Sequence, residues 1–458
     1  MEERKLKLNT KTTFFIGLAF FAILMLWQVY NTYCPLILEE LLASKYEDSD
    51  RLTYVIGIIM AMDNLAALIL MPIFGNLSDR THTKIGKRMP YILIGMIASA
   101  ICFPLIAVFY LNNSLIGVIL FMGFVLIIMQ SYRSPAVALM PDVTPKPLRS
   151  KANGIINLVG YIGAILAGAL AIFFKVGEGD KGGYTYLWPF LISAVCMIVA
   201  MVILWLKVDE PAILEKNKDD IEYGELQSQS LSEIKEDKPL SKADFRNLII
   251  LLVAIFFWFM SFNAVETFNS LFTKKILDNS GIHGTFTIIL TVSSIISFIF
   301  LSGISTKLGR KMTIVIGLIM LVVALTGIAL FTLLLSTEMV SKYVFVIYIL
   351  TVIIGVGWAL VNINSYPMIV EMASRKNVGK FTGYYYMASM VAQTATPILV
   401  GLLMSFNNSG LKILYIYSSI LMFVSLVVFF FSKERRNPLK DKAQEKKSAL
   451  ENLGDIDN

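Results

Sequence analysis

Long uncharged apolar runs dominate this chain and restrict the folds open to it. A helix needs about 20 consecutive apolar residues to cross a bilayer. Thr12–Leu38 and Ala152–Phe174 carry no charge, and Met89–Tyr132 is long enough for two helices, the second continuing to about Met140. The further predicted spans are Leu52–Ser78, Gly182–Leu206, Asn247–Thr273, Asn279–Thr306, Met312–Thr337, Tyr343–Val370, Phe381–Leu411 and Ile413–Ser432. The sequence therefore predicts an all-α membrane protein with twelve transmembrane helices, six on each side of one polar stretch.

Composition supports this class and disfavours others. Hydrophobic residues make up 56% of the chain and charged residues only 16%, against about 25% charged in soluble proteins. A soluble enzyme, a disordered chain and a nucleic-acid partner are disfavoured. The net charge of +7 is typical of cytoplasmic loops in membrane proteins. The few histidines and the cysteines in apolar stretches predict no metal site, no cofactor and no disulfide framework.

The distribution of basic residues predicts the topology. The basic start is followed by an apolar run too long for a cleavable signal, so the first span is expected to stay. Short loops on the side of the N-terminus hold more Lys and Arg than those on the other side, which places both termini in the cytoplasm of a multi-pass cell-membrane protein.

The same reading divides the chain into five parts. It predicts a cytoplasmic N-terminus at 1–11, a six-helix bundle at 12–206, a cytoplasmic linker at 207–245, a second bundle at 246–432 and a disordered tail at 433–458. The linker is read as a solvated connection, with a regulatory docking segment as the alternative.

The two halves repeat each other. When Asp142 is laid on Glu371, Lys151 falls on Lys380 and Gly154 on Gly383. Two parallel six-helix repeats joined by a linker are typical of transporters that open alternately to either side of the membrane. Glycines of the fifth span and Gly401 predict a close-packed sliding face between the bundles.

A charged loop follows the second span and is echoed after the eighth. Gly75-x-x-Ser78-Asp79-Arg80 leads to Gly86-Lys87-Arg88-Met89. This string resembles the loop signature of the major facilitator superfamily. Asp79 is expected to latch the bundles, and Asp142 and Glu371 to pair with basic residues that follow them. The predicted cytoplasmic gate residues are Asp79, Arg80, Arg88, Asp142, Arg149, Glu371 and Lys380.

Three charges fall inside predicted spans, where an ionisable side chain is costly and points to function. Arg133 can donate to two vicinal hydroxyls through its planar guanidinium. Asp63 and Glu266 are carboxylates that can load and release a proton. The structural alternative is a static pair between Arg133 and a carboxylate that holds helices together.

Polar and aromatic residues gather on the same spans. In the facilitator architecture the first, fourth, seventh and tenth helices line the cavity, so the resemblance implies that these residues face a ligand. Amides and Arg can take the hydroxyls of a sugar while aromatic faces cover its ring. Helix packing and interfacial belts are the alternative. The predicted substrate-binding residues are Trp27, Gln28, Asn31, Gln130, Arg133, Trp258, Asn263, Trp358, Asn362, Asn364 and Gln393.

Several strings resemble one narrower family. Trp27-Gln28 with Pro35, Arg133-Ser-Pro-Ala-Val-Ala-Leu-Met-Pro-Asp142 and Asn263-Ala-Val-Glu266-Thr are similar to the glycoside–pentoside–hexuronide:cation symporters, most of all to bacterial relatives of the sucrose:proton symporters. The resemblance implies a monomer that imports a sugar or glycoside with a cation. Ala67 and Met71 stand where the melibiose-type members have sodium-binding aspartates, which favours a proton.

Two other functions remain open. An exporter of amphipathic compounds predicts a cavity lined by Met and Phe. An integral-membrane enzyme predicts a nucleophile with its base, or metal ligands, at one depth. The polar residues on the first, fourth, seventh and tenth spans favour the symporter, and the chain is predicted not to be an enzyme.

Overall fold

The computed structural model describes residues 6–46, 52–232, 241–301, 308–373, 377–406 and 410–434. Within these ranges twelve helices are long and apolar enough to cross a membrane, which confirms the predicted fold class. They are α1 (Thr10–Ala43), α2 (Thr53–Asp79), α3 (Met89–Leu111), α4 (Leu115–Val143), α5 (Arg149–Phe173), α6 (Tyr184–Lys207), α8 (Lys242–Leu277), α9 (Gly281–Leu301), α11 (Arg310–Leu334), α13 (Phe345–Val370), α14 (Val378–Phe406) and α15 (Ile413–Phe430). The predicted tail beyond 434 lies outside the described residues.

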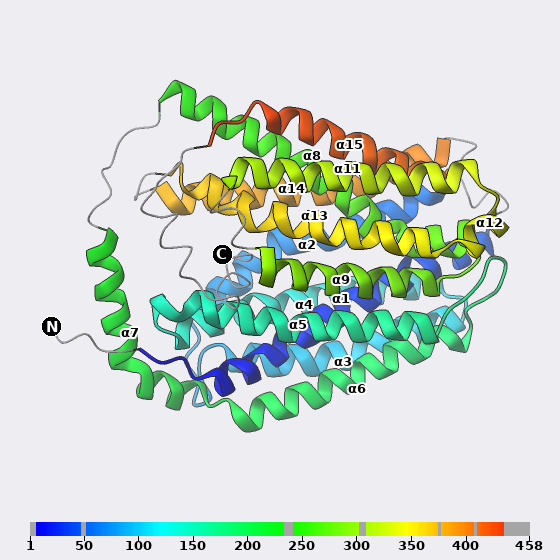
Figure 1. Cartoon of the computed structure of the whole chain (residues 1–458). Coiled ribbons are helices and arrows are strands. Elements are labelled where there is room, and N and C mark those ends of the chain that lie inside the picture. Colours follow the sequence, from blue (N-terminus) through cyan, green and yellow to red (C-terminus); the bar gives the residue numbers. More distant parts are fainter. Residues whose placement is uncertain are drawn as a thin grey trace.

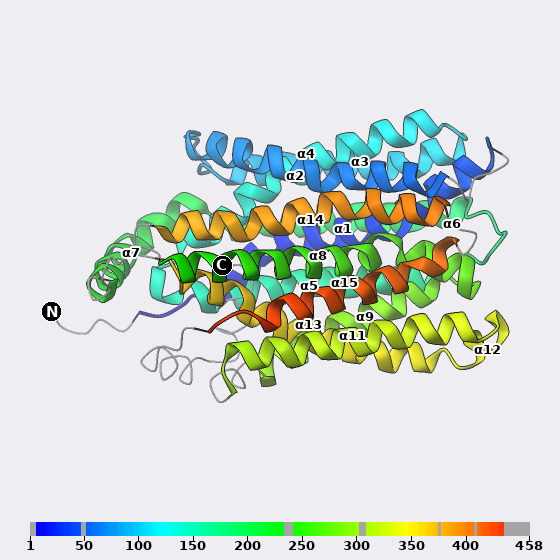
Figure 2. The ribbon, with the colours of Figure 1, turned by 90° about the horizontal axis from the view of Figure 1, so that it is seen from above.

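Helices α1–α6 form the N-bundle, and α8, α9, α11, α13, α14 and α15 form the C-bundle. In Figure 1 these helices run along one common direction, with α7 (Glu210–Ser232) near one end and the short α12 (Thr337–Lys342) at the other. We call these the α7 end and the α12 end. The bundles meet where α2 packs on α14, α5 on α9 and α1 on α8, and Figure 2 shows α2 beside α14 from above.

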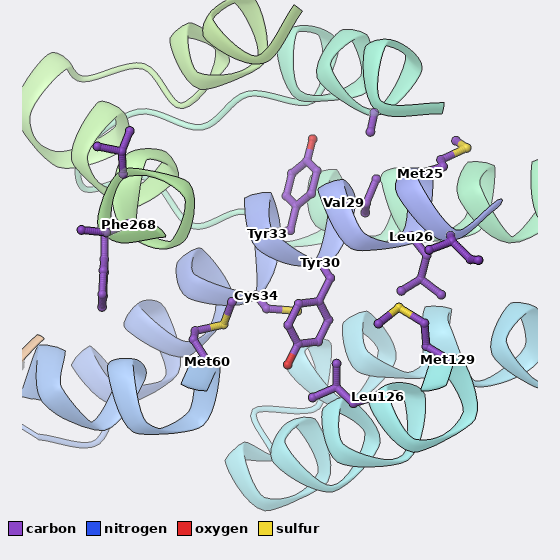
Figure 3. Close-up of a cluster of buried hydrophobic side chains, with 14 of the residues drawn as sticks. Met25, Leu26, Val29, Tyr30, Tyr33, Cys34, Met60, Leu126, Met129 and Phe268 are labelled. Carbon is purple, nitrogen blue, oxygen red and sulfur yellow. The ribbon is translucent and has the colours of Figure 1, made fainter. Parts of the chain in front are cut away.

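Helix α1 lies in the interior, and its side chains pack on several helices at once. Figure 3 shows Tyr30 pointing toward Leu126 of α4 and Tyr33 pointing to the opposite side. The Tyr33 hydroxyl donates to the carbonyl oxygens of Leu170 and Phe174 at 3.2 and 3.3 Å. Because α1 is buried on several sides, polar residues on it must bond other helices or a ligand.

The first part of the predicted linker is the docked helix α7. Glu210 is fully buried, and its carboxylate accepts the backbone N–H groups of Lys87, Arg88 and Met89, with distances of 3.0 to 3.3 Å. These are free N–H groups at the start of α3, where the helix dipole also favours a negative charge. Asn217 donates to the carbonyl of Val143 at 3.0 Å. This part of the linker is therefore not simply solvated, and 233–240 lies outside the described residues.

The C-bundle repeats this cap. Glu434 follows α15 and accepts the backbone N–H groups of Arg310 at 2.8 Å and Lys311 at 3.1 Å, at the start of α11. Each bundle thus ties the beginning of its third helix to the segment after its sixth. The echo of the charged loop is only partly described, since 302–307 lies outside the described residues.

Candidate functional site

The three predicted membrane charges come together between the bundles. The guanidinium of Arg133 on α4 lies over the ring of Trp27 on α1, 4.6 Å from its centroid. Glu266 on α8 lies within hydrogen-bonding reach of Trp27 and Asn263 and within electrostatic range of Arg133. Asp63 on α2 is within electrostatic range of both Arg133 and Glu266. Side chains from both bundles therefore build one charged centre.

Several buried polar atoms near this centre have no hydrogen-bond partner among the described residues. They include Oδ1 of Asp63, Oδ1 of Asn263 and the hydroxyl of Tyr30. Gln130, one turn from Arg133 on α4, is fully buried with neither amide atom bonded. Each such atom costs about 1–3 kcal/mol if it stays unsatisfied. A polar ligand or water that bonds them would remove this cost.

An aromatic cluster of the C-bundle, which we call the aromatic wall, joins α8 to α13 through Trp258, Phe262 and Trp358. The rings of Phe262 and Trp358 are stacked at 3.7 Å with an interplanar angle of 18°, and Trp258 meets Trp358 edge-on at 5.3 Å. Trp358 is half-buried. The sequence indicated both tryptophans but gave no signal for Phe262, since one phenylalanine in an apolar span is ordinary.

The other predicted amides bond helices rather than the charged centre, among the contacts of the described residues. Gln28 donates to the Thr287 hydroxyl of α9 at 3.2 Å, across the bundles. Asn362 and Asn364 donate to carbonyls of their own helix at 3.0 and 2.8 Å. Asn31 and Gln393 take part through their backbone carbonyls, which accept from Ser270 at 3.5 Å and Asn64 at 3.3 Å.

The predicted gate charges of the N-bundle pair within that bundle. Arg88 donates through Nε to Asp142 at 2.9 Å and also pairs with Asp79, and Lys87 lies 3.0 Å from Asp142. Asp79 was expected to latch the two bundles, and its described ion pair instead joins α2 to the start of α3. Asp142 pairs with residues that precede α3, rather than with the basic residues that follow Asp142 in the sequence, because the start of α3 lies beside the end of α4.

The C-bundle has the equivalent pair, with Arg310 2.9 Å from Glu371. The expected basic partners lie elsewhere. Arg149 is within electrostatic range of Asp142, but its Nε donates to the Thr144 carbonyl at 3.1 Å. Lys380 is exposed, with Nζ 5.8 Å from the centroid of the Tyr384 ring.

The remaining predicted gate residue, Arg80, caps α2 at its exposed end. Arg375, one of the basic residues that follow Glu371, lies outside the described residues.

Among the described residues, ion pairs join the two bundles at the α12 end. Lys274 of α8 is 2.5 Å from Glu40 and 3.4 Å from Glu39 of α1, and Lys275 is 2.8 Å from Glu39. The sequence indicated these charges only as loop residues. The two bundles are thus joined at this end.

The predicted sliding face is only partly between the bundles. A Cβ on Gly168 would meet the Gly284 carbonyl of α9, and one on Gly401 would meet the Thr53 carbonyl of α2. Gly163 instead faces the backbone of α1 within the N-bundle. The glycines therefore serve close packing both within and between bundles.

Comparison with known proteins identifies the family of this chain. A family model described as the Major Facilitator Superfamily matches residues 16–347 and 320–456. The isoprimeverose transporter of Lactiplantibacillus pentosus is 20% identical over 276 residues, which are 59% of this chain and 55% of that protein. The match therefore spans about half the length of that relative.

Solved structures share the fold over nearly the whole chain. A structure of the nucleoside transporter NupG has a TM-score of 0.65 at 13% identity and covers 92% of this chain and 99% of that chain. The xylose transporter XylE from E. coli has a TM-score of 0.60 at 14% identity, covering 93% and 99%. A D-xylose-proton symporter has a TM-score of 0.61 at 15% identity, covering 93% and 97%. At these identities the likeness establishes the fold alone.

Proposed function

Because this chain belongs to the Major Facilitator Superfamily and is a multi-pass membrane transporter rather than an enzyme, we propose that it imports a sugar or glycoside together with a proton. The proposal rests on the charged centre. There Arg133 lies over the Trp27 ring, and the carboxylates of Asp63 and Glu266 both interact electrostatically with its guanidinium. The site lies between two bundles, as alternating access requires.

The sugar is recognised by complementary walls. Arg133 donates to vicinal hydroxyls, and the unpartnered Asn263 Oδ1 accepts another hydroxyl. The Trp358 ring, held by stacking on Phe262, covers the apolar face of the sugar ring. Isoprimeverose and xylose, the sugars after which the similar transporters are named, are neutral polyols that suit these walls.

Proton coupling follows from competition for Arg133. While Glu266 and Asp63 are ionised, their charges hold the guanidinium. A proton on one carboxylate weakens that hold and frees guanidinium N–H groups for the sugar. By linkage, bound sugar then favours the protonated carboxylate to the same extent. The coupling cation is therefore a proton bound at these carboxylates.

The α7 end faces the cytoplasm in this proposal, and the protein works as a monomer in the cell membrane. The excess of basic residues in the short loops at that end supports the orientation. An exporter of amphipathic compounds is disfavoured by a centre with three ionisable groups. The α12 end then faces outward, and the present structure is closed on that side.

Uptake into proteoliposomes tests the proposal. Labelled isoprimeverose, xylose, other mono- and disaccharides and nucleosides are offered with and without an acid-outside pH gradient. We expect at least one sugar to accumulate only with the gradient. Accumulation of a nucleoside but of no sugar, or sugar uptake indifferent to the gradient, would contradict the proposal.

A further inference from the structure

A second ionic cluster lies away from the central site, at the α12 end. Glu39 and Glu40 are close to the end of α1, and Lys274 and Lys275 are in the last turn of α8. Lys274 is only 2% exposed and Glu39 8%. Burial of this kind is stable only while both signs of charge are present.

The N-bundle half of this cluster is built without the C-bundle. Glu40 accepts a hydrogen bond from Tyr186 of α6 at 2.6 Å and one from Tyr110 of α3. The backbone N–H of Gly182 donates to the same carboxylate at 3.1 Å. The negative end of the α1 dipole disfavours a carboxylate here, and these donors offset that cost. The Glu40 carboxylate is therefore held in place whether or not α8 is near.

From this arrangement we propose that Glu40 with Tyr110 and Tyr186 is a preformed seat for the Lys274 ammonium, and that docking of Lys274 in it closes the α12 end during each transport cycle. Glu39 assists, because it contacts both lysines of α8. When the bundles separate at this end, Lys274 leaves into water while Glu40 keeps its tyrosine donors. The seat is thus the fixed half of a latch, and the lysine is its moving half.

Two uncharged hydrogen-bonded contacts also join the bundles at the α12 end, and we expect both to break when the latch opens. The Ser280 hydroxyl accepts the Val176 N–H at 2.8 Å, and the Ser280 N–H donates to the Val176 carbonyl at 3.0 Å. The hydroxyls of Thr53 on α2 and Ser405 on α14 are 3.0 Å apart. Because Thr53 and Ser405 lie on α2 and α14 and not on the helices that carry Glu40 and Lys274, cysteines placed there report closure without replacing a latch residue.

The test is the rate of disulfide formation in the full-length Thr53→Cys/Ser405→Cys protein in membranes, without sugar, quantified by mass spectrometry of the joined peptides. Adding Lys274→Gln is expected to slow it by about tenfold or more, as the closed population falls. Glu39→Gln is expected to slow it less, and Lys342→Gln, which removes an exposed lysine at the same end, leaves it unchanged.

Equal rates in the Lys274→Gln, Glu39→Gln and Lys342→Gln proteins would overturn the latch. Gel filtration of each variant checks folding, and if Lys274→Gln is not monodisperse, Glu39→Gln decides. The readout needs no sugar and no proton gradient. Its failure is therefore distinguishable from failure of the proposed transport function.

Discussion

The two bundles share a scaffold but differ in the side chain at one equivalent position of the repeat. Arg133 precedes Asp142 by the same interval as Asn362 precedes Glu371, so the two residues are equivalent in the repeat. Arg133 lies over Trp27 in the charged centre, whereas Asn362 donates to a carbonyl of its own helix.

The carboxylates at the α7 end behave differently, since both copies keep their pair. Asp142 pairs with Lys87 at 3.0 Å, and Glu371 pairs at 2.9 Å with Arg310, which holds the equivalent position after a glycine. The comparison teaches that matched charges are kept at the helix ends of both bundles, whereas the position proposed to bind the sugar differs between them. A sugar has a hydroxyl edge and an apolar face, which unequal walls can both satisfy.

The largest effect is expected at the residue that breaks the repeat. Arg133→Ala should abolish sugar accumulation in proteoliposomes, because in the proposed function the guanidinium donates to the sugar and pairs with the carboxylates. Asn362→Ala is the matched control at the equivalent position and should keep most of the activity. Equal losses in the two variants would mean that the walls act alike, against the comparison drawn here.

The second-largest effect is expected at Glu266, the carboxylate that the C-bundle contributes to the charged centre. Glu266→Gln should lose gradient-driven accumulation yet keep exchange of internal for external sugar, since exchange needs no net proton movement. Counterflow and uphill uptake measured on the same vesicles separate the two. A variant that still concentrates sugar as the native protein does would remove Glu266 from coupling.

A smaller effect is expected at the aromatic wall. Trp358→Leu should raise KM about tenfold, which corresponds to roughly 1.4 kcal/mol of lost ring contact. Trp188→Leu is the matched control, because Trp188 on α6 is 52% exposed on the protein surface. Initial rates over a range of sugar concentrations give both values. An unchanged KM in Trp358→Leu would show that the C-bundle wall does not touch the sugar.

The smallest effects are expected where the bundles are alike. Glu210→Ala and Glu434→Ala each remove a carboxylate that caps a helix start, at a cost of about 1 kcal/mol. Both should lower the melting temperature of the detergent-solubilised protein by similar amounts while uptake persists. If one substitution is harmless and the other is severe, the caps are not equivalent.

The sequence predicted much of the fold because each membrane-spanning helix corresponds to a long apolar run with few or no charges. It also indicated Asp63, Arg133 and Glu266, since charges at membrane depth are rare enough to be noticed. It did not give the partners of Asp142 or the capping role of Glu210. Those contacts depend on which helix ends lie side by side, and spacing along the chain does not encode that.

The ionic cluster at the α12 end shows a second limit. Glu39 and Lys274 flank apolar runs and therefore resemble loop charges, but α1 continues to Ala43 and α8 to Leu277. Only the crossing of the two helices shows that these charges meet. Likewise, the amides of Asn362 and Asn364 match a sugar site by type, yet their donors are used by their own helix.

The most direct test of sugar–proton coupling is the external pH of a lightly buffered suspension of de-energised proteoliposomes when a transported sugar is added. The account predicts that the medium becomes alkaline as sugar enters, and that Arg133→Ala and Glu266→Gln abolish this signal. Sugar entry into native vesicles with no change in external pH would contradict the account.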